Sequence, residues 1–153
     1  MNAIRHKIDF ILSRTLIIIM SLMVINVLWQ VFTRYLSSSP SSFTDELSRY
    51  LMIWVGILGA AYVSGKNQHV AIDYLPSKLN EKSRKRLEVF VHIIVLLFAL
   101  LAFVIGGIRL VYISFTLGQT TPALGMPLAV VYIVIPLSGL LIIYYKLADL
   151  LKK

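Results

Sequence analysis

Long stretches without any charged side chain are the feature that most restricts how this chain can fold. No charged residue occurs in 15–33, 50–65, 89–108 or 110–145. A helix needs about 20 apolar residues to cross the roughly 30 Å hydrocarbon core of a bilayer. The four stretches therefore predict four membrane-spanning segments, and the last stretch is long enough to include a connection as well.

The composition supports a membrane location and a helical fold. Hydrophobic residues make up 58% of the 153 residues and charged residues only 14%, which is too apolar for a soluble domain. Because lipid offers no hydrogen bonds to an exposed backbone, a spanning segment must be a helix or part of a closed β-barrel. The alternating polarity of barrel strands is absent from the sequence. We expect an all-α integral membrane protein with four transmembrane helices.

Turn-forming residues set the expected boundaries within this single membrane domain, 1–153. Two glycines and two prolines between 118 and 127 divide the last apolar stretch and indicate an uncharged loop. Ser42 followed by Asp45 is typical of a helix start, so the second helix is expected to begin at the membrane interface. We expect helices at about 9–36, 43–65, 84–115 and 127–149, joined by loops at 37–42, 66–83 and 116–126.

Basic residues are concentrated in three segments of the chain. The first fourteen residues, the region 66–86 and the C-terminal residues from 146 onward carry 12 of the 15 Lys and Arg residues. Such an excess is typical of cytoplasmic segments, so both termini and the loop 66–83 are expected in the cytoplasm and the other two loops outside. Lipid headgroups can satisfy these cations. The net charge of +8 is therefore interpreted as topology and not as nucleic-acid binding.

The predicted spans carry few groups that could perform chemistry. The absence of cysteine excludes disulfides, thiolate metal sites and a thiol nucleophile. The carboxylates lie at or beyond the ends of the spans, whereas a small pump or antiporter would need one at mid-membrane depth. His92 is the single histidine inside a span, so a haem would lack a second axial ligand. We expect no enzyme activity, no metal site and no cofactor in this chain.

Polar and small side chains instead indicate contacts between helices. Asn26, Gln30 and Arg34 recur every four residues and therefore share one face of the first helix. Gly56 and Ala60, with the same spacing, form part of a small-residue ridge on the second helix that lets another backbone approach closely. For both features the sequence leaves open whether the neighbour belongs to this chain or to another protein.

A group of residues around the second helix forms a distinctive motif. It consists of Arg34-Tyr35, Glu46, Arg49-Tyr50, Trp54, Gly59-Ala60-Ala61, Gly65-Lys66, His69 and Asp73. This pattern resembles the small membrane subunit, of the DctQ type, of tripartite ATP-independent periplasmic (TRAP) transporters. The likeness covers nearly the whole chain in length, number of spans and orientation, although its specific motif lies mostly in the second helix and its flanks.

This resemblance implies a non-catalytic scaffold subunit of a sodium-coupled secondary transporter in the bacterial inner membrane. The implied partners are a large multi-span subunit, which holds the substrate and sodium sites and moves like an elevator, and a periplasmic substrate-binding protein. Such systems import organic acids, and a sialic acid or a C4-dicarboxylate is the expected class here. The alternative is a stand-alone four-helix protein that acts as a small homo-oligomeric exporter or channel.

The start of the second helix has two possible roles. Arg49 is spaced three and four residues from Glu46 and Asp45, so a local ion pair is expected there. The alternative is that Glu46 contacts the large subunit or the docked binding protein. Trp54, further along the helix, is expected in an aromatic belt at the outer membrane surface.

Two groups of residues are expected on the cytoplasmic side. His69 and Asp73 lie four residues apart, and we expect them to form a structural pair at the membrane interface. Three consecutive cations open the third helix and are expected to contact anionic phospholipid headgroups. These cations are Arg84, Lys85 and Arg86.

Overall fold

A computed structural model describes residues 2–37, 41–66 and 80–151, and all regular elements in these ranges are helices. Four helical stretches are long and apolar enough to cross a membrane, which confirms the predicted all-α class with four transmembrane helices. The first two spans are single helices. They are α1 (Asn2–Ser37) and α2 (Ser42–Gly65).

The third span is one continuous helix with a change of winding in its middle. It begins as α3 (Glu81–Phe98), continues through the π-helical segment η2 (Ala99–Gly106) and ends as α4 (Gly107–Thr116). The residues at both junctions keep right-handed helical backbone angles, so the span is not broken there.

The fourth span is interrupted near its start. It comprises α5 (Leu128–Tyr132) and α6 (Val134–Leu150), which meet at Ile133. Pro136 has no backbone N–H to donate to the carbonyl of Tyr132, and its ring crowds the preceding turn. The interruption between Tyr132 and Val134 therefore follows from the proline one turn later.

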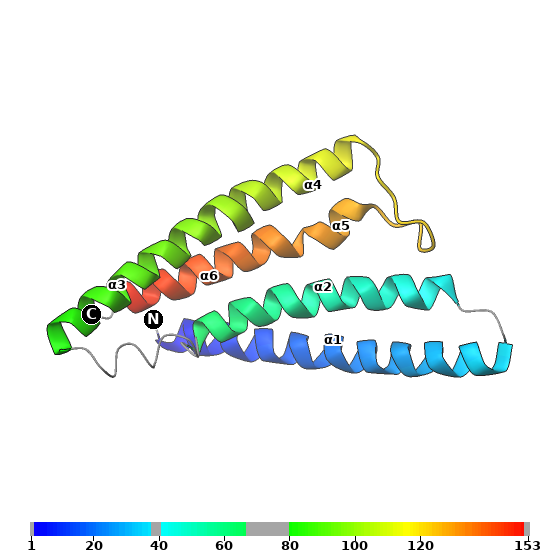
Figure 1. The fold of residues 1–153 in the computed structure, drawn as a ribbon, viewed down its shortest axis with the longest axis horizontal. Helices are drawn as coiled ribbons and strands as arrows, with labels where there is room; N and C mark the ends of the chain where they lie inside the picture. Colours follow the sequence, from blue (N-terminus) through cyan, green and yellow to red (C-terminus); the bar gives the residue numbers. More distant parts are fainter. Residues whose placement is uncertain (1, 38–40, 67–79, 152–153) are drawn as a thin grey trace.

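The four spans form a layer one helix thick (Figure 1). α1 packs on α2, α2 also packs on α6, and α6 in turn packs on η2 and α3. The spatial order of the spans is thus first, second, fourth, third. Buried apolar side chains such as Leu58, Ala61 and Tyr145 follow the contacts of α2 with its two neighbours instead of filling a central core.

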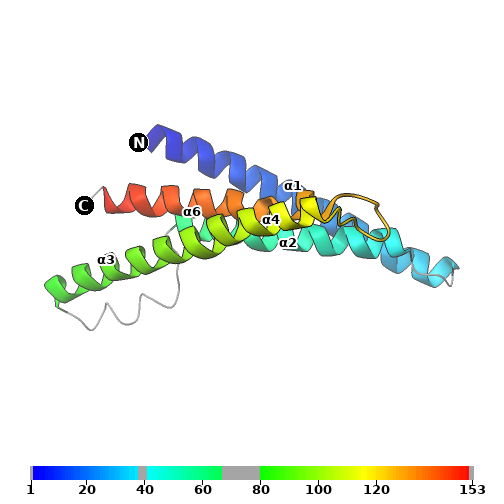
Figure 2. The ribbon, with the colours of Figure 1, turned by 90° about the horizontal axis from the view of Figure 1, so that it is seen from above.

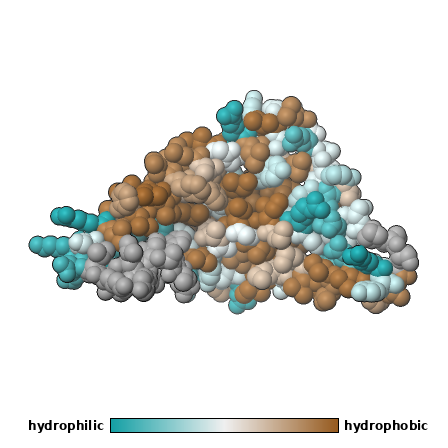
Figure 3. All heavy atoms as spheres, viewed as in Figure 1, coloured by the Kyte–Doolittle hydropathy of each residue, from teal (hydrophilic) through white to brown (hydrophobic). Residues whose placement is uncertain are grey.

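Both chain termini lie at the same end of this layer (Figure 1), which we call the terminal end; the connection 117–127 lies at the opposite, loop end. Seen from above, the spans overlap in the middle and diverge towards the terminal end, so the layer is twisted (Figure 2). Apolar side chains cover the middle of the face in Figure 3, and hydrophilic ones gather towards its two ends. This distribution matches that of a bilayer-spanning protein.

α1 begins at Asn2, although the apolar run predicts a start at about residue 9. The additional turns carry Arg5, and Asp9 follows at the expected start; both side chains bind residues of α6. Tertiary contacts therefore extend the helix beyond the segment that a membrane alone would require. The bounds of the other spans differ from the expected ones by three residues or fewer.

Candidate interaction surfaces

The polar face of α1 is divided between contacts inside the chain and an open position. The Asn26 amide donates to the Thr44 carbonyl at 2.7 Å and to the Ser48 hydroxyl at 2.6 Å. Gln30 donates to Asp45 Oδ1 at 3.3 Å. Arg34 is exposed and forms no hydrogen bond or ion pair within the described part of the chain. Asn26 and Gln30 thus join α1 to α2, and Arg34 is left to contact something else.

Glu46 fastens the loop between the third and fourth spans. Its Oε2 accepts the backbone N–H groups of Ala123 and Leu124 at 2.6 and 3.0 Å, and its Oε1 accepts the Tyr50 hydroxyl at 2.7 Å. The side chain is buried despite its charge. Charge-assisted hydrogen bonds of this kind are shorter and stronger than neutral ones. The carboxylate is therefore occupied within the chain.

The ion pair expected at the start of α2 involves Asp45. Arg49 Nη2 lies 2.8 Å from Asp45 Oδ2, with both side chains more than half exposed. Of the two carboxylates that the spacing allowed, Arg49 binds the one that faces solvent, because the other is turned towards the loop at 123–124.

Trp54 connects two spans by its polar atom. Its indole N–H donates to the Val131 carbonyl at 3.1 Å, and Val131 lies in α5 just before the interruption at Ile133. This residue therefore packs between α2 and the fourth span in addition to any position in an aromatic belt.

The small-residue ridge of α2 remains open. Gly56 and Ala60 are exposed, and a Cβ atom built on Gly56 or Gly59 would meet nothing within 4 Å. Within the described residues, the ridge has no helix packed against it at these positions. The neighbour that the spacing predicts is thus not provided at Gly56 by any residue that the structure describes.

A cluster of ionic contacts at the terminal end was missed by the sequence patterns. Arg5 lies 2.5 Å from Asp149, donates to the Gly65 carbonyl and stacks on Tyr145, whose hydroxyl donates to Asp9 at 2.6 Å. The buried Lys146 ammonium donates to the Ser64 carbonyl at 3.3 Å. These contacts join α1, α2 and α6. The sequence shows only that charges of both signs occur near both termini, so no periodic signal identifies the pairs.

The remaining predicted residues lie near or beyond this end. His69 and Asp73 lie outside the described residues, so their expected pair stays a prediction. Arg84 binds Glu88 at 3.1 Å on the exposed side of α3. Lys85 and Arg86 point to a different part of the helix surface, where they border a shallow hollow.

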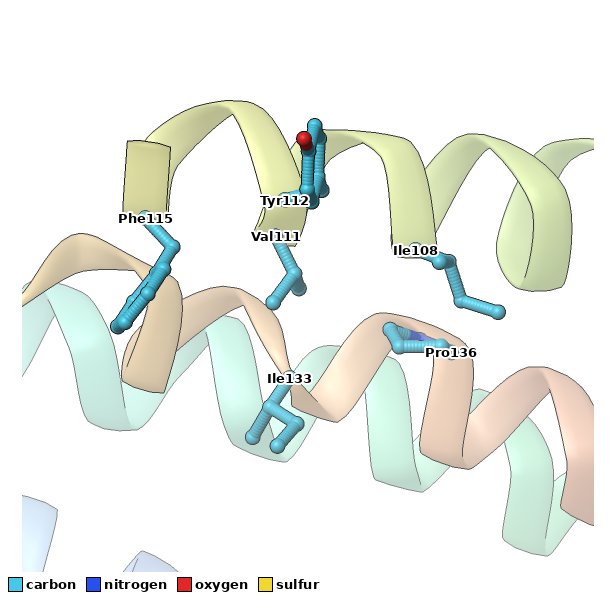
Figure 4. A pocket seen from close by; sticks show the side chains of 6 residues that line it. All are labelled: Ile108, Val111, Tyr112, Phe115, Ile133 and Pro136. Carbon is cyan, nitrogen blue, oxygen red and sulfur yellow. The ribbon is translucent and has the colours of Figure 1, made fainter. Parts of the chain in front are cut away.

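Two further hollows in the layer are apolar. One of about 360 Å³ lies between α4 and the fourth span, and Val111 and Phe115 point into it in Figure 4. The other, about 470 Å³, lies between α1 and α6 and is also lined by Trp54 and Leu58 of α2. Neither holds a carboxylate or a cation. The described residues also contain no group of three His, Asp or Glu side chains that could hold a metal ion. These hollows suit lipid or apolar side chains.

Comparison with known proteins decides the family. The family described as tripartite ATP-independent periplasmic transporters, DctQ component, matches residues 23–153. The chain belongs to the DctQ family. One relative, a protein of Haemophilus influenzae described as a TRAP transporter small permease protein, is 32% identical over 142 residues, which cover 93% of this chain and 86% of the relative. The resemblance seen in the sequence is thereby confirmed.

Two further relatives extend the comparison. The ectoine TRAP transporter small permease protein TeaB of Halomonas elongata is 25% identical over 140 residues, 88% of this chain and 71% of TeaB. The sialic acid TRAP transporter permease protein SiaT of Haemophilus influenzae is 35% identical over 80 residues, 52% of this chain but 13% of SiaT. The DctQ-family chain is thus a multi-pass membrane component of a transporter, and the prediction that it is not an enzyme is confirmed.

Proposed function

We propose that this chain is the scaffold subunit of a sodium-coupled TRAP importer in the bacterial inner membrane. In this proposal it packs against a large multi-span permease subunit, to which a periplasmic binding protein delivers an organic acid. The large subunit holds the substrate and sodium sites and moves them in an elevator-type step. The DctQ-family chain stays fixed and braces that movement.

The single-layer arrangement is the observation that carries the proposal. In the most apolar stretch of each span, few residues are buried inside the chain. The buried fraction ranges from 6% in the third span to 39% in the fourth. A self-contained helical membrane protein builds its site in the core of a bundle. A layer one helix thick offers two broad apolar faces instead. Such a shape suits a chain that lies along another membrane protein.

The face that carries Gly56 and Ala60 is the proposed contact with the large subunit. Small residues let two helix backbones approach closely, and van der Waals packing of this kind drives association in lipid. Gly56 has free space above it, so a helix of another protein can reach the α2 backbone there. The relative SiaT supports a larger partner, because most of that permease lies outside its match to this chain.

For the substrate we propose an organic acid, with a sialic acid to be tested first and a C4-dicarboxylate second. Two matched relatives are named for sialic acid and one for ectoine. The two apolar hollows of this chain offer no charged group to bind a carboxylate. Selection of the substrate is therefore assigned to the partners.

The decisive experiment reconstitutes transport from separate parts. The tagged chain is expressed with the large permease and the binding protein encoded beside it, and sodium-dependent uptake of labelled sialic acid is measured in proteoliposomes. We expect the permease to copurify and uptake to require all three proteins and a sodium gradient. Uptake that proceeds equally well without this chain would contradict the scaffold role. A homo-oligomer that moves solute alone would favour the exporter or channel.

A further inference from the structure

The start of α3 presents cations and apolar side chains on one surface. A shallow hollow of about 390 Å³ is bordered by Lys85 and Arg86 at one end and by Val89, Phe90 and Ile93 along the helix. Residues at these spacings share one face, because positions four residues apart are neighbours on a helix. Phe90 and Ile93 are more than half exposed. The hollow thus combines a positive end with an apolar wall.

The three consecutive cations of this segment differ in what surrounds them. Arg84 is compensated by Glu88, which accepts its hydrogen bond at 3.1 Å. Lys85 and Arg86 form no ion pair with any carboxylate of the described chain. Glu81 lies four residues before Lys85 on the same face but forms no ion pair with it among the described residues, and Lys82 beside it carries the opposite charge. The net positive charge beside the hollow therefore rests on Lys85 and Arg86.

We propose that this hollow binds one anionic phospholipid of the bilayer. The phosphate group lies between Lys85 and Arg86, and an acyl chain follows Val89, Phe90 and Ile93 towards the middle of the membrane. Basic side chains next to a membrane helix attract anionic headgroups. A general attraction of cations to the membrane surface would involve Arg84 as much as its two neighbours. The proposed site does not include Arg84, which binds Glu88 and does not line the hollow. It does not depend on which protein partner the layer binds.

The test compares charge-neutral variants at adjacent positions. Binding of phosphatidylglycerol and of phosphatidylcholine to the purified full-length chain in detergent is measured by native mass spectrometry. One basic side chain near an anionic surface contributes roughly fivefold to binding, so Lys85→Gln with Arg86→Gln should weaken phosphatidylglycerol binding about 25-fold. The matched control Arg84→Gln should change it less than about twofold, and the exchange Lys85→Arg with Arg86→Lys should retain it. Phosphatidylcholine binding should not follow this pattern.

Several outcomes would overturn the proposal. Equal losses in the double variant and in Arg84→Gln would show a nonspecific surface attraction. Displacement of the lipid by inorganic phosphate would show a phosphate site without a role for the apolar wall.

Circular dichroism checks that the variants keep their helices. A measurement on the unmodified chain is independent of any misfolding: raising salt from about 0.1 M to about 1 M shortens the Debye length from about 10 Å to about 3 Å and should weaken phosphatidylglycerol binding selectively.

Discussion

The glycines of this chain fall into two groups that behave differently. A Cβ atom on Gly139 would lie 2.7 Å from Phe103 Cβ, and one on Gly107 would lie 2.9 Å from Pro136 Cδ. These positions are where the third and fourth spans touch. In contrast, a Cβ atom on Gly56 would meet nothing within 4 Å. The same residue type thus marks a closed contact in one place and an open face in the other.

The difference separates what the chain stabilises by itself from what it leaves to a partner or to lipid. The spacing of the glycines does not distinguish the two groups, because small residues favour close helix contacts in either case. The atoms that surround each glycine in the structure do distinguish them. If the comparison is correct, substitutions in the closed group should damage the isolated chain, and substitutions in the open group should damage the assembly.

The largest effect on stability is expected for Gly139→Leu. The added side chain would collide with the Phe103 side chain and with its backbone carbonyl carbon, 3.3 Å from the Cβ position, so α6 and η2 would have to separate. Overfilling a packed contact typically lowers the free energy of unfolding by about 1–3 kcal/mol. Thermal unfolding of the purified chain in detergent measures this loss. An unchanged midpoint would show that the spans are less closely packed than described.

A smaller and more local effect is expected for Glu46→Ala. The variant leaves the backbone N–H groups of Ala123 and Leu124 without their acceptor, so the loop should open more often. We expect hydrogen exchange of these two amides to accelerate by about tenfold or more, while exchange in the spans stays unchanged.

The neighbouring carboxylate provides the control for this loop. Asp45→Ala removes an exposed ion pair with Arg49, which contributes no more than about 0.5 kcal/mol, and the exposed hydrogen bond from Gln30, but no contact with the loop at 123–124. Exchange at Ala123 and Leu124 should therefore stay as in the unmodified chain. If both variants released the loop equally, the hydrogen bonds of Glu46 would not be what fastens it.

No loss of stability in the isolated chain is expected for Gly56→Leu. Free space surrounds this position, so the free energy of unfolding should not fall, and the higher helix propensity of leucine should raise it by no more than about 1 kcal/mol. In the assembly the same side chain would push away a helix packed on this face. We expect the amount of copurified large permease to fall severalfold. Full copurification would place the partner on another face, and a loss of stability would show that Gly56 belongs with the closely packed glycines.

The number and approximate limits of the spans followed from the sequence, because hydrophobicity and length are local properties of each segment. The uncharged runs and the turn residues at 118–127 are sufficient for them, except at the start of α1. The family was also evident, since its motif, from Arg34 to Asp73, lies mostly in the second helix and its flanks. The contacts that the motif residues make were harder to predict. Glu46 was expected near Arg49, but it binds amides 77 and 78 residues away.

Four apolar helices, the DctQ family and most helix ends to within three residues were predictable from the sequence; the start of α1 was not. The order of the spans in the layer, the contact of Arg5 with Asp149 and the division between packed and open glycines appear only in the tertiary structure. The physical reason is that each helix satisfies its backbone hydrogen bonds within its own segment. Which side chains then meet depends on residues up to 144 positions apart, and no periodicity within one segment records that distance.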